Sequence, residues 1–513
     1  PVSEDPLSDG REGPGGAVSG GGGVPALDPA TLRRRAKLGV LLLAARTVAQ
    51  QFIMWGGLIY LARALDPGEF GIFWIVQFAM SFFSLFGDAG FGAALIQKRD
   101  EATDEELSSV FWAQLLLGSA VVLVVYVTAP WVVTFWPDLP QSSVWMLRAL
   151  SLGLLLTSAR VIPAILMERE LLFGRLSVID LVLTASFYGS AVVFAHRGYG
   201  PYALVAGVLV QGAAGLLAAL LLRPWRPVLR LSLQILRPIL RFGVPFQAKH
   251  MIGFVNAAVM PLYAGSALGR YSFGLVSWSR NTAFFPLMAI EILARVNFPL
   301  LSRQQHDRTA FVQTLERTIQ VCATLTLFAV ALFLGLGPSV VRVLFGDKWM
   351  PALPMLYAFA VVSMVAFISP IMNGALDALG KPQVMMRLGI GWTILNWVAC
   401  TVAMHIRSGA LSFTIGYCVH ILAGNLAVVF VIKQLIPDTR IWPKIRTAML
   451  AGLGAATLSR WGFLPWAGGP LTLAAAVVAT IATFVTLLAL VDRSALRELL
   501  AMLRNRLRRE MIR

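Results

Sequence analysis

Apolar residues recur along the chain in long stretches separated by short polar connections, from about Leu38 to Val491. A helical span of a bilayer needs about 20 apolar residues, and on that basis we count about fourteen stretches of membrane-spanning length. The pattern predicts an all-α polytopic membrane protein with these segments as its transmembrane helices: 38–62, 70–97, 109–134, 145–167, 177–196, 201–222, 242–264, 272–295, 313–337, 355–377, 387–406, 410–434, 447–463 and 471–491.

Composition and charge agree with a membrane protein. Of the 513 residues, 57% are hydrophobic and 13% charged, and the mean hydropathy is +0.73, values outside the range of soluble domains. The formal charge of +17 does not indicate nucleic-acid binding, because the cations gather in alternate connections. Basic clusters precede the first segment, follow the sixth and close the chain: Arg33, Arg34, Arg35 and Lys37, then Arg223, Arg226, Arg230, Arg237 and Arg241, then seven arginines from Arg493 to Arg513. By the positive-inside rule both termini are cytoplasmic.

The chain ends and the cysteines suggest no further chemistry. Residues 1–36 contain a Gly-rich run and are predicted to be a disordered cytoplasmic tail, and residues 492–513 a basic cytoplasmic tail. The three cysteines, Cys322, Cys400 and Cys418, fall in predicted spans without a C-x-x-C spacing, so we expect packing residues and neither a metal site nor a disulfide.

Two parts of the chain resemble each other. A shift of 203 residues aligns Tyr60 with Tyr263 and Phe70-Gly71 with Phe273-Gly274, and a shift of 209 further along aligns Gln211 with His420. We therefore predict two pseudo-symmetric six-helix lobes, which enter the membrane in the same sense and enclose the substrate path between them. The predicted divisions are an N-lobe (37–222), a basic amphipathic cytoplasmic linker (223–241) that lies against anionic headgroups, a C-lobe (242–434) and two further helices (435–491).

Charged residues occur inside the predicted spans and repeat with the lobes. The shift of 203 residues places Asp88 on Glu291 and Arg46 on Lys249. At 1.5 Å per residue, both bases lie roughly 10–12 Å from the inner ends of their spans. Four lipid-facing charges would cost roughly 10–14 kcal/mol, so these side chains are expected to face a protein interior or a wet cavity.

Two interpretations of these charges are open. They are ion pairs that pin neighbouring helices, Asp88 with Arg46 and Glu291 with Lys249, or they act in function. Arg160 and Arg280 are further deep cations, and Gln77 is the repeat counterpart of Arg280. A cavity lined by Arg46, Lys249, Arg160 and Arg280 would suit an anionic substrate such as a diphosphate, whereas Asp88 and Glu291 would suit coupling to H⁺ or Na⁺. Glycines in "GDAGFG" (87–92) mark a place where the helix bends or a neighbour approaches closely.

Three segments carry a family resemblance: "DAGFGAALIQKRDEATDEELSSVFW" (88–112), "VNFPLLSRQQHD" (296–307) and "VLFGDKWMPALPML" (343–356). They resemble the polysaccharide transporter family, the lipid-linked oligosaccharide and O-antigen flippases of the multidrug/oligosaccharidyl-lipid/polysaccharide superfamily. The resemblance implies a multi-pass protein of the bacterial inner membrane. It would move undecaprenyl-diphosphate-linked oligosaccharide from the cytoplasmic to the periplasmic leaflet by alternating access. Membrane lipids, a polysaccharide polymerase and glycosyltransferases are the further partners that this role suggests.

Two other functions compete with this one. A drug or cation antiporter of the same superfamily would favour acids and aromatic residues in its cavity, whereas four deep cations face two deep acids here. A membrane-embedded polysaccharide polymerase or ligase would need a sizeable outer loop with acid and base groups. The longest outer stretch, 338–354, has Asp347 as its one carboxylate and no histidine, so we expect no catalytic residue and no cofactor.

Overall fold

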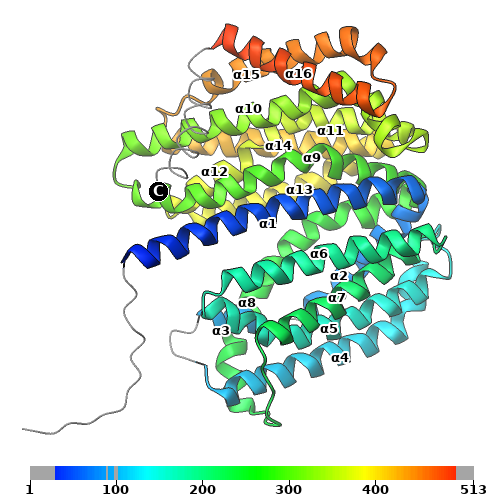
Figure 1. The fold of residues 1–513 in the computed structure, drawn as a ribbon, viewed down its shortest axis with the longest axis vertical. Helices are drawn as coiled ribbons and strands as arrows, with labels where there is room; N and C mark the ends of the chain where they lie inside the picture. Colours follow the sequence, from blue (N-terminus) through cyan, green and yellow to red (C-terminus); the bar gives the residue numbers. More distant parts are fainter. Residues whose placement is uncertain (1–28, 88–89, 98–101, 493–513) are drawn as a thin grey trace, which may run out of the picture.

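The computed structural model describes residues 29–87, 90–97 and 102–492, and all regular elements in this part of the chain are helical (Figure 1). The terminal tails predicted at 1–36 and 492–513 lie largely outside it. Short π or 3₁₀ turns extend several helices: η1 (Val259–Ala264), η2 (Val341–Phe345), η3 (Asp347–Ala352), η4 (Ser459–Phe463) and η5 (Leu464–Trp466). The α-helices are α1 (Pro29–Ala64), α2 (Pro67–Gly87), α3 (Phe91–Gln97), α4 (Asp104–Thr134), α5 (Ser143–Arg169), α6 (Phe173–His196), α7 (Tyr202–Leu222), α8 (Leu233–Ala258), α9 (Gly265–Arg303), α10 (Arg308–Val340), α11 (Leu353–Ala366), α12 (Ile368–Ala378), α13 (Pro382–Ile406), α14 (Ala410–Leu435), α15 (Ile441–Leu458) and α16 (Pro470–Val491).

The predicted spans coincide with these helices. Ten helical stretches of the described chain are long and apolar enough to cross a membrane, and the four remaining predicted spans fall on α1, α8, α9 and α15, which are less apolar. The class of all-α polytopic membrane protein is confirmed, whereas the count of fourteen spans stays a prediction. Two predicted spans are divided: 70–97 into α2 and α3, and 355–377 into α11 and α12.

The first of these divisions lies at the glycines that the sequence singled out. Gly90 has a φ of +75°, a conformation that glycine adopts without steric cost. A Cβ at this position would lie 2.6 Å from the carbonyl oxygen of Gly243. Both the predicted bend and the predicted close approach therefore occur at Gly90, where α3 packs against α8.

Helix neighbours repeat between the two parts of the chain. Among α1–α7, which we term the N half, α1 packs on α6, α6 on α7, α7 on α5, α5 on α4, and α2 on both α4 and α5. Among α8–α14, the C half, α8 packs on α13, α13 on α14, α14 on α11, α11 on α10, and α9 on both α10 and α11. The last pair, α15 and α16, packs on α10 at one end of the long axis (Figure 1).

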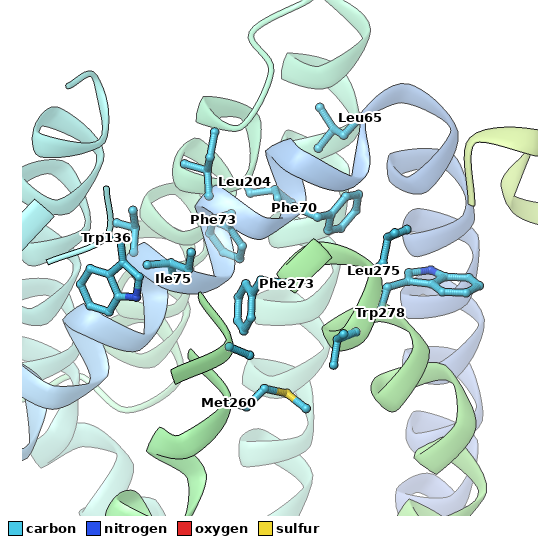
Figure 2. Close-up of a cluster of buried hydrophobic side chains, with 14 of the residues drawn as sticks. Leu65, Phe70, Phe73, Ile75, Trp136, Leu204, Met260, Phe273, Leu275 and Trp278 are labelled. Atoms are coloured by element: carbon cyan, nitrogen blue, oxygen red, sulfur yellow. The ribbon is translucent and has the colours of Figure 1, made fainter. Parts of the chain in front are cut away.

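The two halves meet where α2 crosses α9, at a pair of glycines that the repeat makes equivalent. A Cβ at Gly71 would lie 1.9 Å from the carbonyl oxygen of Arg270, and a Cβ at Gly274 would lie 1.9 Å from that of Pro67. Since 67 and 270 are themselves related by 203 residues, the crossing has local two-fold pseudo-symmetry. Small residues allow such close approach of helices in membranes. Figure 2 shows the aromatic side chains around it, including Phe70 and Phe273.

We expect Gly71→Ala to destabilise the protein, because its methyl group would overlap a backbone carbonyl that cannot turn aside. Gly56→Ala is the matched control: Gly56 also lies in a helix, and nothing occupies the space within 4 Å of its Cβ position. That control should raise stability by about 0.5–1 kcal/mol through helix propensity. Thermal unfolding of both purified variants measures the difference, and equal shifts would contradict the tight crossing.

The predicted linker is held against α4. Its first ten residues, 223–232, are not helical. The backbone N–H of Val228 donates to Ser108 Oγ (3.0 Å) and that of Ser232 to Ser109 Oγ (3.2 Å), while Trp112 Nε1 donates to the Val228 carbonyl (2.9 Å). Leu229 remains 89% exposed. The predicted contact of the linker with anionic headgroups stays a prediction.

Candidate substrate path

A cavity of about 300 Å³ lies inside the N half, between α2, α5, α6 and α7. Its polar lining consists of Gln77, Ser84, Thr157, Arg160 and Gln211. Gln77 Oε1 is buried and has no hydrogen-bond partner among the described residues. The lining thus offers one cation, several neutral hydrogen-bonding groups and no carboxylate.

Arg160 is the charged residue of this cavity, and the helix opposite makes room for it. It lies half-buried on α5, and a Cβ at Gly215 on α7 would be 3.3 Å from its Nη1 atom. The absence of a side chain at Gly215 leaves room for Leu183 Cδ2, which is the closest atom to that position, and also for the guanidinium of Arg160. The structure thus places Arg160 in the wall of this cavity, and its role in substrate binding stays a prediction.

Arg46 forms an ion pair with Asp180, which links α1 to α6. Arg46 Nη2 lies 2.9 Å from Asp180 Oδ2, with the two side chains 27% and 42% exposed. Gln50 accepts a hydrogen bond from Arg46 Nε (3.0 Å) and donates to the Asp180 carbonyl (3.0 Å) and to Thr184 Oγ1 (3.1 Å). This network fixes the guanidinium against α6.

Asp180 is a functional candidate that the sequence analysis missed. It lies three residues inside the predicted span 177–196, and the signal that could have identified it is a carboxylate within a predicted span. Its carboxylate also attracts Arg160 through space. Arg46, Asp180 and Arg160 therefore form a charged group on three helices of the N half, with a formal charge of +1.

The predicted partners in the second half are only partly described. Asp88 lies outside the described residues, as do the side chains of Lys249 and Glu291. The predicted layer of two bases and two acids therefore stays a prediction.

Among the described residues, Cys322 and Cys400 are buried free cysteines, and no group of three His, Cys, Asp or Glu residues is arranged to hold a metal ion.

Arg280 lies in an aromatic environment within the C half. Its guanidinium carbon is 5.7 Å from the ring centroids of Phe284 and Tyr417, a separation at which cation–π attraction acts. Its Nε atom is buried and lacks a hydrogen-bond partner within the described chain. Tyr417 in turn packs edge-on against His420, with ring centroids 4.6 Å apart.

The two halves use equivalent positions in different ways. The sequence alignment pairs Gln77 with Arg280 and Gln211 with His420. Gln77 and Gln211 line one cavity in the N half, and Arg280 and His420 contact one tyrosine in the C half. At these two pairs of equivalent positions, the N half therefore has amides and the C half has ionisable groups.

The helix arrangement and the charged interior define a multi-pass α-helical membrane protein built from two related bundles. The chain belongs to the family of polysaccharide biosynthesis proteins, whose family model matches residues 60–354. This confirms the resemblance drawn from the sequence motifs.

Similar proteins agree with this family. The teichuronic acid biosynthesis protein TuaB of Bacillus subtilis (strain 168) is 24% identical over 67% of this chain and 72% of its own length. The succinoglycan biosynthesis transport protein ExoT of Rhizobium meliloti (strain 1021) is 27% identical over 87% of this chain and 91% of its own.

Solved structures share the fold. The lipid II flippase MurJ in an inward closed conformation superposes with a TM-score of 0.70 at 12% identity, covering 90% of this chain and all of that one. An inward-facing multidrug resistance transporter of the MATE family, from the MOP superfamily, gives a TM-score of 0.59 at 15% identity, covering 78% of this chain and all of that one.

Proposed function

We propose that this protein is a flippase that moves a lipid-linked oligosaccharide from the cytoplasmic to the periplasmic leaflet of the bacterial inner membrane. The observation that carries the proposal is the N-half cavity, whose single charged lining residue is Arg160. Membership of the polysaccharide biosynthesis family supports the substrate class. The names of ExoT, a transport protein, and of MurJ, a flippase, support the type of activity.

The chemistry of the cavity fits the headgroup of such a lipid. A diphosphate that enters a low-dielectric region must have its negative charge compensated, and a guanidinium does this with hydrogen bonds of fixed geometry. The amides of Gln77 and Gln211 and the hydroxyls of Ser84 and Thr157 offer further hydrogen bonds to phosphate or sugar oxygens. Arg280 provides a second cation in the C half. The undecaprenyl tail would stay in the bilayer while the headgroup crosses.

Alternating access between two halves is the movement that we propose for this step. The repeated helix neighbours support it, because two related bundles can rock against each other in a membrane transporter. The basic clusters support a cytoplasmic position for both termini and for the segment 223–241. We propose that Asp88 and Glu291 couple the cycle to H⁺ or Na⁺.

A drug or cation antiporter is the second candidate, since the MATE transporter shares the fold. The cavity lining argues against it, because it contains Arg160 and no acid. An enzyme is a weaker candidate. In the outer stretch 338–354 the one carboxylate, Asp347, accepts a hydrogen bond from Arg342 Nε at 2.9 Å.

A lipid extract tests the proposed function in the cell. We expect a strain without this protein to accumulate one undecaprenyl-diphosphate oligosaccharide in the cytoplasmic leaflet, because synthesis continues while transfer stops. Mass spectrometry of the extracted lipids identifies the oligosaccharide, and the same strain with the gene restored is the control. An unchanged lipid profile, together with altered resistance to cationic drugs, would instead support the antiporter.

A further inference from the structure

Four connections between helices meet at the side of the protein where α1 ends, opposite to its N-terminal end. They are residues 62–67 and 135–142 of the N half and residues 259–270 and 341–352 of the C half. We term this region the outer junction. In the proposed orientation it faces the periplasm.

Two tryptophans form hydrogen bonds across the outer junction, one donated by the N half and one donated by the C half. Trp136 Nε1, from the N half, donates to the carbonyl oxygen of Pro261 in the C half at 2.8 Å. Trp349 Nε1, from the C half, donates to the carbonyl oxygen of Ala62 in the N half at 2.7 Å. Trp136 is 4% exposed and Trp349 0% exposed, so both bonds are shielded from water.

The two bonds occupy equivalent places in the repeat. Each tryptophan follows the third predicted span of its own half and contacts the end of the first predicted span of the other half. Ala62 belongs to the last turn of α1, where carbonyl groups lack partners within the helix. Trp349 therefore supplies a donor to a carbonyl that would otherwise need water.

Charged residues reinforce the junction beside each tryptophan. Asp138 Oδ2 accepts a hydrogen bond from the backbone N–H of Arg270 at 2.8 Å. Lys348 Nζ donates to the Arg63 carbonyl at 2.8 Å and lies 3.4 Å from Asp66 Oδ1. These bonds again run from one half to the other. They flank the glycine crossing of α2 and α9.

We propose that Trp136 and Trp349 are the latch residues of the outer gate: their paired indole hydrogen bonds hold the halves together at the outer junction and must break when the path opens outward. The proposal rests on the alternating-access part of the proposed function. A hydrogen bond that joins two moving bodies biases their equilibrium, whereas one within a single body does not. Loss of two such bonds should shift the ratio of open to closed outer junctions about 30-fold, equivalent to about 2 kcal/mol at 1.4 kcal/mol per factor of ten.

Distance measurements between spin labels test the latch without any substrate. Tyr199, in the connection after α6, and Arg407, in the connection after α13, are exposed positions in the two halves. Both are changed to cysteine and labelled in a full-length background in which Cys322, Cys400 and Cys418 are alanine. We expect the double variant Trp136→Phe/Trp349→Phe to raise the ratio of the longer to the shorter distance about 30-fold, and each single variant about 5-fold.

Trp397→Phe is the matched control. Trp397 Nε1 donates to the Val255 carbonyl at 3.1 Å, but both residues belong to the C half. The variant loses the same chemical group and the same type of bond, and the distance distribution should not change. A shift equal to that of the double variant would show that loss of an indole loosens the protein in general, which would overturn the proposal.

Asp138→Ala keeps the test valid if the tryptophan variants do not fold. The Asp138 side chain is 55% exposed, so its removal leaves the core intact, and we expect a smaller shift in the same direction, about 5-fold. Unchanged distances in the folded Asp138→Ala and tryptophan variants would mean that these bonds do not control opening of the outer junction, which would overturn the proposal. A shifted distance in a protein that fails to flip lipid-linked oligosaccharide would retain the latch and reject the proposed substrate.

Discussion

The Arg160→Ala variant is expected to flip a labelled lipid-linked oligosaccharide in proteoliposomes on the order of 100-fold more slowly than the parent protein. A hydrogen bond to a charged group contributes about 1.5–3 kcal/mol, and each 1.4 kcal/mol changes a population or rate about tenfold. Removal of the cavity's one cation leaves the diphosphate without charge compensation in the N half. Because Arg160 lines a cavity, its replacement by alanine should enlarge that cavity and leave the helix packing in place.

Two further variants decide what Arg160 does. Arg148→Ala removes another arginine of α5. The Arg148 guanidinium stacks on Tyr126 and Trp145, outside the cavity, so the flipping rate should change little. Arg160→Lys keeps the charge but loses the planar guanidinium, so partial activity is expected. If Arg160→Ala retains the parent rate while both controls behave as expected, the cavity is not on the substrate path.

The single variant Arg46→Leu should lower the free energy of unfolding by on the order of 2–3 kcal/mol, because it leaves Asp180 without its partner in a membrane helix. The double variant Arg46→Leu/Asp180→Leu should recover most of that loss, since both charges are removed together. Thermal unfolding in detergent measures both effects. This loss is smaller than the about 3–5 kcal/mol typical of a fully buried pair, because both side chains are partly exposed.

Flipping assays on the same two variants distinguish a structural role of Arg46 from a role in substrate binding. If Arg46 serves only to join α1 to α6, the double variant should regain flipping together with stability. If Arg46 also contacts the substrate, stability returns while flipping does not. A single variant with parent stability would show that the 2.9 Å contact between Arg46 and Asp180 contributes little.

The sequence predicted the helical class and the helix positions well, because membrane-spanning stretches are recognised from local apolarity alone. It also predicted the repeat and the glycine region at 87–92, since a cluster of glycines in an apolar span allows a bend or a close approach of helices. It could not place the divisions of 70–97 and 355–377. Those breaks depend on contacts with distant helices, such as that of Gly90 with Gly243.

The candidate site was harder to predict. The cost of exposing a charge to lipid predicts that Arg160 and Arg280 face away from it. The structure places Arg160 in a cavity wall and buries Arg280 Nε, and their part in substrate binding stays a prediction. The ion pair of Arg46 with Asp180 did not follow, because pairing across 134 residues of sequence is a matter of helix packing and no local pattern shows it. Trp136 and Trp349 were missed for the same reason.

The attachment of the last two helices has a consequence for how movement could be observed. Because α15 and α16 pack on α10, they would travel with the C half as one body. A fluorescent domain fused beyond Val491 would therefore report the tilt of that body relative to the bilayer, at a site remote from both the cavity and the outer junction. Such a fusion would allow the proposed alternating-access movement to be followed in single molecules.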